Sequence, residues 1–310
     1  MMDNATQVLW QYLDERGYRG RAMSPEHIHD LYEAVEGRHA RGDLDEEFYQ
    51  QQLTGFSYVP PAELPDPVSL IVVAVPAPQV RVVFAWQGGR FPLIIPPTYV
   101  GYRATTRRVV QELAAFLEPW GYRAAATSLP LKTLAVGSGL GAYGRNNICY
   151  VPGMGTFHQL VGCYSDFPCA QDQWPGPTML PRCEKCRACA QVCPTGAISS
   201  ERFLLHAERC LTFHNERERE FPAWIDPSSH HVLIGCMQCQ RSCPENKPFL
   251  SWVVEGVQFA EDETRLLLQA PAIDQLPGET AAKVSSLGLT AGWDILSRNL
   301  AAVLERGRGL

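Results

Sequence analysis

The stretch CEKCRACAQVCPTGAI, residues 183–198, and the stretch CMQCQRSCPENK, residues 236–247, determine how the second half of this chain is interpreted. The first has the cysteine spacing C-x2-C-x2-C-x3-C-P and the second has C-x2-C-x3-C-P, while Cys210 stands alone between them. Such close spacing lets three thiolates face one iron–sulfur cubane while the fourth comes from elsewhere in the chain. The two stretches therefore predict two 4Fe-4S clusters.

The cysteine before each proline decides how the ligands are shared. In the two-cluster bacterial ferredoxin pattern, that cysteine serves the other cluster. One predicted ligand set is therefore Cys183, Cys186, Cys189 and Cys243. The other is Cys210, Cys236, Cys239 and Cys193. The alternative is a pair of four-thiolate zinc sites, which leaves the third cysteine of the first motif and both Cys-Pro endings without a reason.

Composition and charge are those of a globular protein. The 310 residues are 45% hydrophobic and 19% charged, which suggests two domains or one elaborated domain. All 11 cysteines lie between Cys149 and Cys243, and Cys149, Cys163 and Cys169 fall outside both motifs. The longest apolar run, VSLIVVAVP, is too short to cross a bilayer. We expect a cytoplasmic protein with metal-bound cysteines, no disulfide scaffold and no membrane partner.

The periodicity of apolar residues predicts an α+β fold. We expect a buried strand at residues 68–75, a hairpin turning at Gly88–Gly89, and amphipathic helices at residues 107–121 and 292–307. The glycine-rich stretch Ala135–Cys169 indicates ligand-contacting loops. The predicted organisation has four parts: an acidic helical segment at 1–60, an α/β domain at 61–175, a double 4Fe-4S ferredoxin-like domain at 176–250, and a short C-terminal helical segment at 251–310.

A glycine-rich sequence, GLGAYG at Gly139–Gly144, matches the G-x-G-x-x-G pattern of dinucleotide-binding folds. Asp166 lies at about the distance along the chain where a ribose-binding acid is found. That fingerprint belongs between a strand and a helix, and no clear helix follows here. A nicotinamide site is therefore disfavoured.

Read in order, LAVGSGLGAYGRNN at 134–147, GMGTFHQLVGCYSDFP at 153–168 and the paired cysteine motifs resemble the epoxyqueuosine reductase family. The stretch SRNLAAVLERG at 297–307 is similar to the closing arginine–asparagine helix of that family. The resemblance implies a cobalamin in the N-terminal α/β domain, as in the related reductive dehalogenases, with the clusters delivering electrons to cobalt. The residues that it places beside cobalamin are Gly139, Leu140, Gly141, Tyr143, Gly144, Arg145, Asn146 and Asn147.

One departure concerns the proton donor. The family uses an aspartate upstream of the glycine-rich loop, and the corresponding position lies near Ala125, with no aspartate between Asp66 and Asp166. Tyrosine or histidine can act as a general acid when its pKa is suitable. The candidate catalytic residues are Tyr102 and Tyr143, and the further candidates near the expected pocket are Tyr99, His158 and Tyr164.

These observations predict a reductase that passes low-potential electrons through two clusters to a bound cobalamin, which reduces an unidentified substrate. One alternative is an electron-transfer protein that serves a corrinoid or other redox partner. Another is an epoxyqueuosine reductase of tRNA queuosine synthesis with a displaced proton donor. The expected electron donor is a ferredoxin or flavodoxin, and the expected substrate is a small molecule or a corrinoid. Because the sequence pI is near 5.8, tRNA is not favoured despite the basic residues of 101–150.

Overall fold

The computed structural model describes residues 2–168, 172–288 and 293–306, so Cys169 lies outside the described residues. The chain divides into two compact units, each made of two separate stretches. Unit 1 contains Met1–Pro76 and Arg103–Cys186, and unit 2 contains Ala77–Tyr102 and Arg187–Leu310. We describe each unit by itself.

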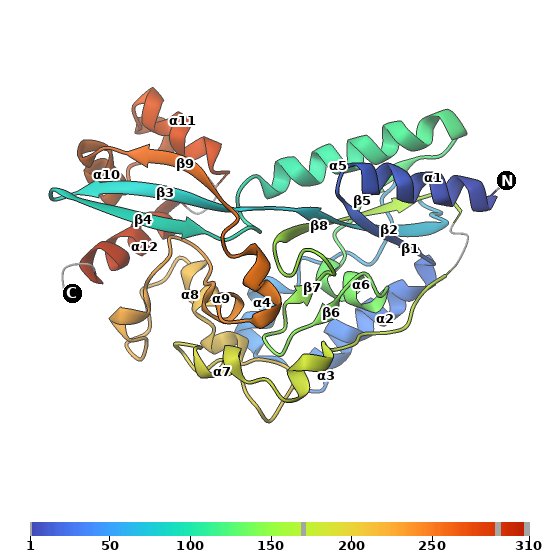
Figure 1. Ribbon diagram of the computed structural model, residues 1–310, viewed down its shortest axis with the longest axis horizontal. Coiled ribbons are helices and arrows are strands. Elements are labelled where there is room, and N and C mark those ends of the chain that lie inside the picture. The colour runs from blue at the N-terminus through green and yellow to red at the C-terminus, as the bar shows by residue number, and fades with distance from the viewer. Residues whose placement is uncertain (1, 169–171, 289–292, 307–310) are drawn as a thin grey trace. The chain divides into compact units, whose positions relative to one another are not determined.

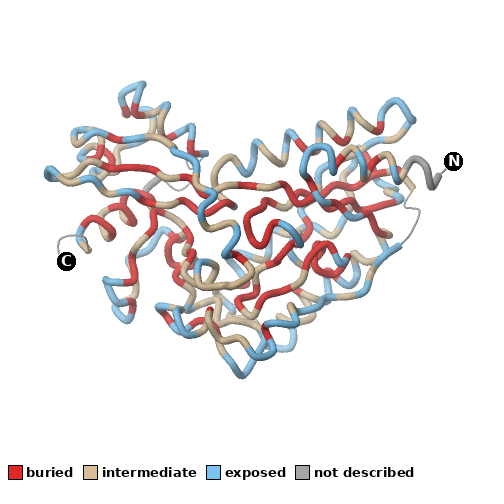
Figure 2. The backbone as a smooth tube through the Cα atoms, in the orientation of Figure 1, coloured by how far each residue is buried: buried red, intermediate tan, exposed pale blue. Residues whose placement is uncertain are grey.

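The core of unit 1 is a four-stranded antiparallel sheet in the order β1-β2-β8-β5. Its strands are β1 (Arg19–Met23), β2 (Ser69–Pro76), β8 (His158–Ser165) and β5 (Ala124–Ala126). The two central strands, β2 and β8, are buried along almost their whole length, as the red tube in Figure 2 shows. The predicted buried strand is thus confirmed as β2. By contrast, β8 lies in a stretch that we expected to be loops, because the polar residues His158 and Gln159 and a glycine obscure its strand pattern.

Helices cover both faces of this sheet. On one face, apolar residues of α1 (Met2–Glu15) and α5 (Tyr102–Leu117) share a core cluster with β2 and β8, and the two helices lie side by side in Figure 1. On the other face, α2 (Ile28–Tyr32) and α6 (Leu131–Gly137) complete a second cluster. The helix expected at 107–121 is therefore part of α5.

The remaining elements of unit 1 are short. Between β1 and β2 the chain forms η1 (Pro25–His27), the π-helical η2 (Glu33–Gly37), α3 (Arg38–Ala40) and α4 (Glu46–Gln52). The predicted helical character of 1–60 is present, although the sequence pattern missed β1. A turn η3 (Glu118–Trp120), a small ladder of β6 (Ala142–Tyr143) with β7 (Cys149–Tyr150), and η4 (Pro181–Glu184) complete the unit.

Unit 2 is built on a three-stranded sheet in the order β4-β3-β9. Strands β3 (Gln79–Trp86) and β4 (Gly89–Ile95) form the predicted hairpin, and β9 (Val253–Phe259) runs parallel to β3. An apolar core joins this sheet to α10 (Glu261–Leu268), α11 (Gly278–Ser286) and α12 (Trp293–Arg306), with η8 (Ile273–Gln275) between α10 and α11. The predicted C-terminal helix is confirmed as α12.

The rest of unit 2 carries six of the eight predicted cluster ligands. Its elements are α7 (Ala188–Gln191), η5 (Ala207–Arg209), α8 (Leu211–Asn215), η6 (Pro227–Ser229), α9 (Gln238–Arg241) and η7 (Pro244–Phe249). The helices α7 and α9, one from each cysteine motif, pack against each other.

The units differ from the predicted domains in two respects. The hairpin of β3 and β4 was expected in the domain at 61–175, but β3 pairs with β9 and the hairpin therefore belongs to unit 2. The segment 251–310 was expected to be helical, yet it begins with β9, whose run VVEGVQF is interrupted by polar residues and a glycine. Of the described helices, none is long and apolar enough to cross a membrane.

Candidate functional site

The two cysteine motifs fold in the same way. In each motif, the last cysteine before the Cys-Pro pair lies on a helix of a single turn. These cysteines are Cys189 on α7 and Cys239 on α9. The cysteine before proline follows two residues after the helix ends, and at Cys243 it caps η7, which starts at Pro244. Proline suits the first position of a helical turn because it lacks the N–H that would be unpaired there. The sequence repeat is therefore a structural repeat.

Three cysteines of the second predicted ligand set lie close together within unit 2. Burial, with smaller contributions from negative charge on Cys210 and Cys193, raises the pKa of the Cys236 thiol to about 12. Burial likewise raises the pKa of Cys210, again with a contribution from Cys193. Cys193 thus lies within electrostatic reach of cysteines from the other motif. This proximity is what the crossed ligand assignment requires.

Hydrogen-bond donors surround these sulfur atoms. The Ala197 N–H donates to the Cys193 Sγ at 3.3 Å, the Thr212 N–H and hydroxyl donate to Cys210, and the Gln238 N–H donates to Cys236. Soft thiolate ligands hold iron–sulfur clusters, and hydrogen bonds to the sulfurs tune their reduction potentials. The hydrogen bonds to Cys193, Cys210 and Cys236 are those that cluster thiolates need, and the full set with Cys239 stays a prediction.

The first predicted set is divided between the units, with Cys183 and Cys186 in unit 1 and Cys189 and Cys243 in unit 2. It stays a prediction. Within unit 1, the glycine-rich loop reaches the first motif directly through Arg145. Its Nη2 donates to the Cys183 carbonyl at 2.6 Å and its Nε to the Cys186 carbonyl at 3.3 Å. The planar guanidinium can serve two carbonyls at once, which a lysine ammonium cannot do with the same geometry.

The glycines of the loop pack against the chain itself. A Cβ atom at Gly141 would lie 2.7 Å from both the Cys149 Sγ and the Tyr150 carbonyl oxygen. At Gly144 it would lie 2.5 Å from the Tyr150 ring. Gly139 has a φ of 73°, and its added Cβ would lie 3.1 Å from Pro175. Internal packing therefore explains these glycines, and no cradle for a corrin can be identified from them.

Other residues predicted to bind the cofactor also have partners within unit 1. The Asn146 Nδ2 donates to the Tyr150 hydroxyl at 3.0 Å, and Leu140 is buried in the core cluster of that side of the sheet. Asn147 occupies the left-handed region with a φ of 57°, which asparagine tolerates. The predicted cobalamin contacts of this loop stay predictions.

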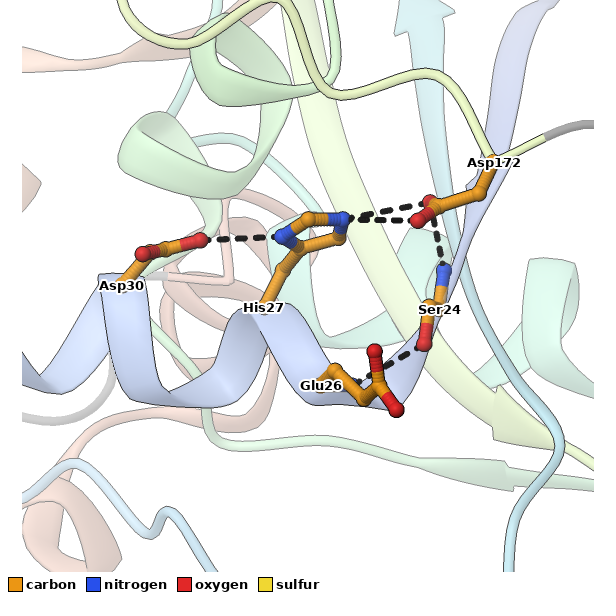
Figure 3. Close-up of polar contacts among 5 residues, drawn as sticks. All are labelled: Ser24, Glu26, His27, Asp30 and Asp172. Atoms are coloured by element: carbon orange, nitrogen blue, oxygen red, sulfur yellow. Dashed lines mark hydrogen bonds and ion pairs between the residues drawn. The ribbon is translucent and has the colours of Figure 1, made fainter.

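A second segment, residues 172–176, lies along the same loop. The Trp174 ring packs so closely on Gly137 that an added Cβ would be 2.4 Å away. The His27 ring stacks on Trp174 with 4.4 Å between centroids. Figure 3 shows His27 held between two carboxylates, with Nδ1 2.9 Å from Asp30 and Nε2 3.0 Å from Asp172. Although partial burial opposes the effect, hydrogen bonds from the Ser24 N–H and from His27 keep the pKa of Asp172 below its ordinary value.

The two candidate catalytic tyrosines have different environments. Tyr143 is buried, and its hydroxyl donates to the Thr133 Oγ1 at 3.2 Å. Burial raises the pKa of Tyr143, while the positive charge of Arg38 opposes the increase. The Lys132 ammonium lies 6.0 Å from the ring centroid. Tyr102 instead begins α5 and is 38% exposed. Of the two tyrosines, Tyr143 has a protonated phenol with the positive charges of Lys132 and Arg38 nearby.

Ala125, near which the resemblance places the aspartate of the family, lies in the core. Ala125 in β5 is 7% exposed and pairs with the buried Tyr164 of β8. Asp166, which we considered as a ribose ligand, instead accepts hydrogen bonds from the backbone and side chain of Arg123. Burial lowers the pKa of His158 to about 4, so this imidazole is neutral at pH 7 and has no imidazolium proton to donate.

Sequence reasoning missed a buried pair in unit 2. The Tyr99 hydroxyl donates to a Glu216 carboxylate oxygen. Burial raises the pKa of Glu216. Burial, followed by the negative charge and hydrogen bond of Glu216, raises the pKa of Tyr99 well above its ordinary value. Cys210 and Cys236 add to the increase at Tyr99, which places this tyrosine beside the second ligand set. No motif marks the pair, because its partners are 117 residues apart in the sequence.

Comparisons with known proteins identify relatives of the cysteine region and of the fold. Residues 182–246 match the family model of a 4Fe-4S double cluster binding domain, a range that includes all eight predicted ligands. The epoxyqueuosine reductase of Streptococcus thermophilus superposes with a TM-score of 0.69 at 19% identity, over 98% of this chain and 81% of that one. The chain resembles the epoxyqueuosine reductases in fold and in sequence. That resemblance, expected from the cysteine motifs and the loop, is confirmed.

Curated epoxyqueuosine reductases match part of the chain. The one from Pseudomonas aeruginosa is 30% identical over 154 residues, which is 47% of this chain and 41% of that protein. The one from Escherichia coli is 33% identical over 129 residues, which is 41% of this chain and 33% of that protein. The matched regions thus span about two fifths or less of these relatives' length. Another solved epoxyqueuosine reductase, with a TM-score of 0.69 at 18% identity, is bound to an epoxyqueuosine-modified tRNA stem loop.

Proposed function

We propose that this chain is an iron–sulfur reductase of the epoxyqueuosine reductase type, with epoxyqueuosine in tRNA as its substrate. The observation that carries the proposal is the sequence similarity to epoxyqueuosine reductases, at 30% to 33% identity over two fifths to nearly half of the chain. The match of residues 182–246 to a double-cluster domain supports the redox part. This proposal reverses our initial preference for an unidentified substrate without tRNA.

The residues of unit 2 would hold one of the clusters. Cys193, Cys210, Cys236 and Cys239 supply the thiolates, and N–H donors such as that of Ala197 stabilise the charge on sulfur. Bound clusters supply low-potential single electrons. Arg145 would fix the backbone of Cys183 and Cys186 for the other cluster through its two hydrogen bonds.

Reductive opening of an epoxide requires a proton for the departing oxygen. We propose Tyr143 as the donor, because its phenol is protonated at neutral pH and the positive charges of Lys132 and Arg38 lie nearby, where they favour the phenolate left after proton transfer and oppose the rise in pKa that burial causes. Its neighbour Thr133 orients the hydroxyl. Tyr102 remains the second candidate on the basis of sequence alone.

Cobalamin is the cofactor that the resemblance implies, and when bound it would supply a reduced cobalt centre. The loop glycines give no independent sign of it, so we assign no step to it. Absorption spectroscopy of the purified protein tests the assignment, because a bound corrin adds its own bands to the broad iron–sulfur shoulder. Wild-type protein without corrin bands, even after incubation with cobalamin, would remove cobalamin from the proposal.

The decisive experiment is turnover. Anaerobically purified protein, reduced and supplied with cobalamin, should convert an epoxyqueuosine-containing tRNA stem loop to the queuosine form, which mass spectrometry detects. Tyr143→Phe should lower turnover by roughly 10²–10⁴-fold, the usual contribution of a general acid. Tyr150→Phe is the matched control, because it removes another buried phenol of unit 1, from β7, whose oxygen accepts a hydrogen bond from the Asn146 Nδ2. Inactive wild type with intact clusters and bound cobalamin would refute the substrate assignment.

A second function is favoured by one specific observation. No aspartate lies between Asp66 and Asp166, and the corresponding position, Ala125, is in the hydrophobic core. A protein that only transfers electrons to a partner needs no such acid. If reduced wild type fails to turn over the stem loop but reduces a corrinoid protein, this alternative replaces the first proposal.

A further inference from the structure

Two neighbouring side chains of α12, Arg298 and Asn299, hydrogen-bond to each other and to backbone carbonyls of other segments. Asn299 is 1% exposed, and its Nδ2 donates to the Asn215 carbonyl and to the Leu233 carbonyl, each at 2.8 Å. One amide therefore joins the end of α8 to the segment that leads into the second cysteine motif. Arg298 and Asn299 are the arginine and asparagine of the stretch SRNLAAVLERG at 297–307.

The segments that Asn299 joins carry two candidate cluster ligands. Cys210 is the N-terminal cap of α8, which ends at Asn215. Cys236 directly follows Gly235, whose carbonyl accepts a hydrogen bond from the Asn215 Nδ2 at 2.7 Å. Asn215 and Asn299 thus form a continuous buried connection between the chain at Cys210 and the chain at Cys236.

Arg298 fixes the chain beyond α8. Its guanidinium donates to the His214 carbonyl at 2.8 Å, to the Arg217 carbonyl at 2.7 Å and to the Arg219 carbonyl. It also lies over the Phe221 ring, 4.1 Å from the centroid. A planar guanidinium with several donors can hold three carbonyls in one geometry, whereas an ammonium cannot reproduce this arrangement.

Tyr99 restricts the segment before Cys236. Gly235 has a φ of 68°, and a Cβ atom there would lie 2.6 Å from the Tyr99 hydroxyl. The Tyr99 hydroxyl donates to Glu216, the residue that follows Asn215. The chain at Cys236 therefore cannot move toward Tyr99, and the asparagine connection holds it toward α8.

We infer that Arg298 and Asn299 are positioning residues for the cluster ligated by Cys210 and Cys236, and that they set its retention and reduction potential. The inference rests on the ligand set of the proposed function. The physical reason is that the N–H groups of Thr212 and Gln238 donate to these two sulfurs, so a shift of either segment changes the hydrogen bonds on which the potential depends.

The test uses Asn299→Ala and Arg298→Lys in the full chain, purified without oxygen. We expect Asn299→Ala to lose roughly half of the iron and sulfide, because one of two cubanes becomes labile. We expect Arg298→Lys to keep its iron but to change the midpoint potential of one cluster, measured by a redox titration followed by electron paramagnetic resonance. The other cluster should titrate as in wild type.

Two matched controls separate positioning from general stability. Thr280→Ala removes another buried hydrogen bond of unit 2, from Thr280 Oγ1 to Glu263 Oε1 at 2.9 Å. Arg90→Lys alters another arginine of unit 2, whose Nη2 donates to the Gln258 Oε1 at 3.0 Å and contacts neither cysteine motif through this bond. Both controls should keep all of the iron and both potentials. Equal effects in the controls and the variants, or equal changes at both clusters, would overturn the inference.

The outcome is independent of substrate turnover. Wild type with two clusters but no activity on epoxyqueuosine leaves this inference standing while the proposed substrate fails. Wild type with two clusters and an Asn299→Ala variant identical to it in iron content and in both potentials refutes the inference alone.

Discussion

Acidification should destabilise the protein through His158 in a way that one variant can isolate. The side chain is 4% exposed, and among the described residues its Nδ1 has no hydrogen-bond partner. Burial lowers the pKa of His158 to about 4, whereas an unfolded histidine titrates near 6.5. Between these two values the unfolded chain binds a proton that the folded chain excludes. The contribution of neutral His158 to the free energy of unfolding is therefore fully present above pH 6.5 and is lost as the pH falls toward 4.

The size of the effect follows from proton linkage. Each unit of pKa difference corresponds to about 1.4 kcal/mol, so the full loss is about 3 kcal/mol and the loss between pH 7 and pH 5 is about 2 kcal/mol. His158→Gln removes this contribution while keeping a polar side chain at the site. Burial also lowers the pKa values of His230 and His231, but these residues contribute equally to both proteins and cancel in the comparison.

Urea unfolding followed by tryptophan fluorescence, at pH 7 and at pH 5, measures the difference. The wild type should lose about 2 kcal/mol more than His158→Gln over this interval. Nuclear magnetic resonance of the His158 ring should show no titration near pH 6.5. The same pH dependence in both proteins, or a ring that titrates near 6.5, would refute the reasoning and would make His158 a candidate acid again.

Three further predictions concern unit 1. Gly141→Val should lower the yield of folded protein regardless of cobalamin, because its Cβ collides with the Tyr150 backbone. Gly55→Val is the control, because a Cβ at Gly55 meets no atom within 4 Å and Gly55 has no positive φ. Circular dichroism and gel filtration compare the two variants. Ala125→Asp should cost several kcal/mol in urea unfolding, since it buries a carboxylate in the core. Asp172→Asn should increase protease cleavage near residues 172–176 at neutral pH. The difference from wild type should shrink as the pH falls from the ordinary pKa of aspartate through the lower pKa that Asp172 has in the folded protein. Equal cleavage at pH 7 would contradict the role of the hydrogen bonds that Asp172 makes with Ser24 and His27.

The local elements could be predicted where one physical signal dominates. The β-branched run of β2 and the apolar stripe of α12 identify a buried strand and an amphipathic helix without further information. The cysteine spacing likewise predicts the double-cluster domain, because iron–sulfur clusters need thiolate ligands at restricted spacings. β8 escaped prediction because its burial comes from pairing with β2 and β5, a tertiary effect that its own composition does not reveal.

The candidate site shows the same division. The loop glycines were expected to face a cofactor, yet Gly141 and Gly144 are required by contacts with Tyr150, several residues later in the chain. The roles of Arg145 and Asn299 depend on carbonyl groups far away in sequence, and backbone acceptors carry no sequence signature. Long-range hydrogen bonds of this kind become visible only in the folded structure.

Iron content in paired cysteine variants tests the central claim of two clusters with crossed ligands most directly. Wild type should contain about eight iron and eight sulfide per chain, and each single alanine variant about half of that. If Cys193 and Cys210 serve the same cluster, the double variant Cys193→Ala/Cys210→Ala should keep as much iron as either single variant, while Cys193→Ala/Cys183→Ala should lose nearly all of it. The reverse pattern, with iron retained in the Cys193/Cys183 pair and lost in the Cys193/Cys210 pair, would contradict the account.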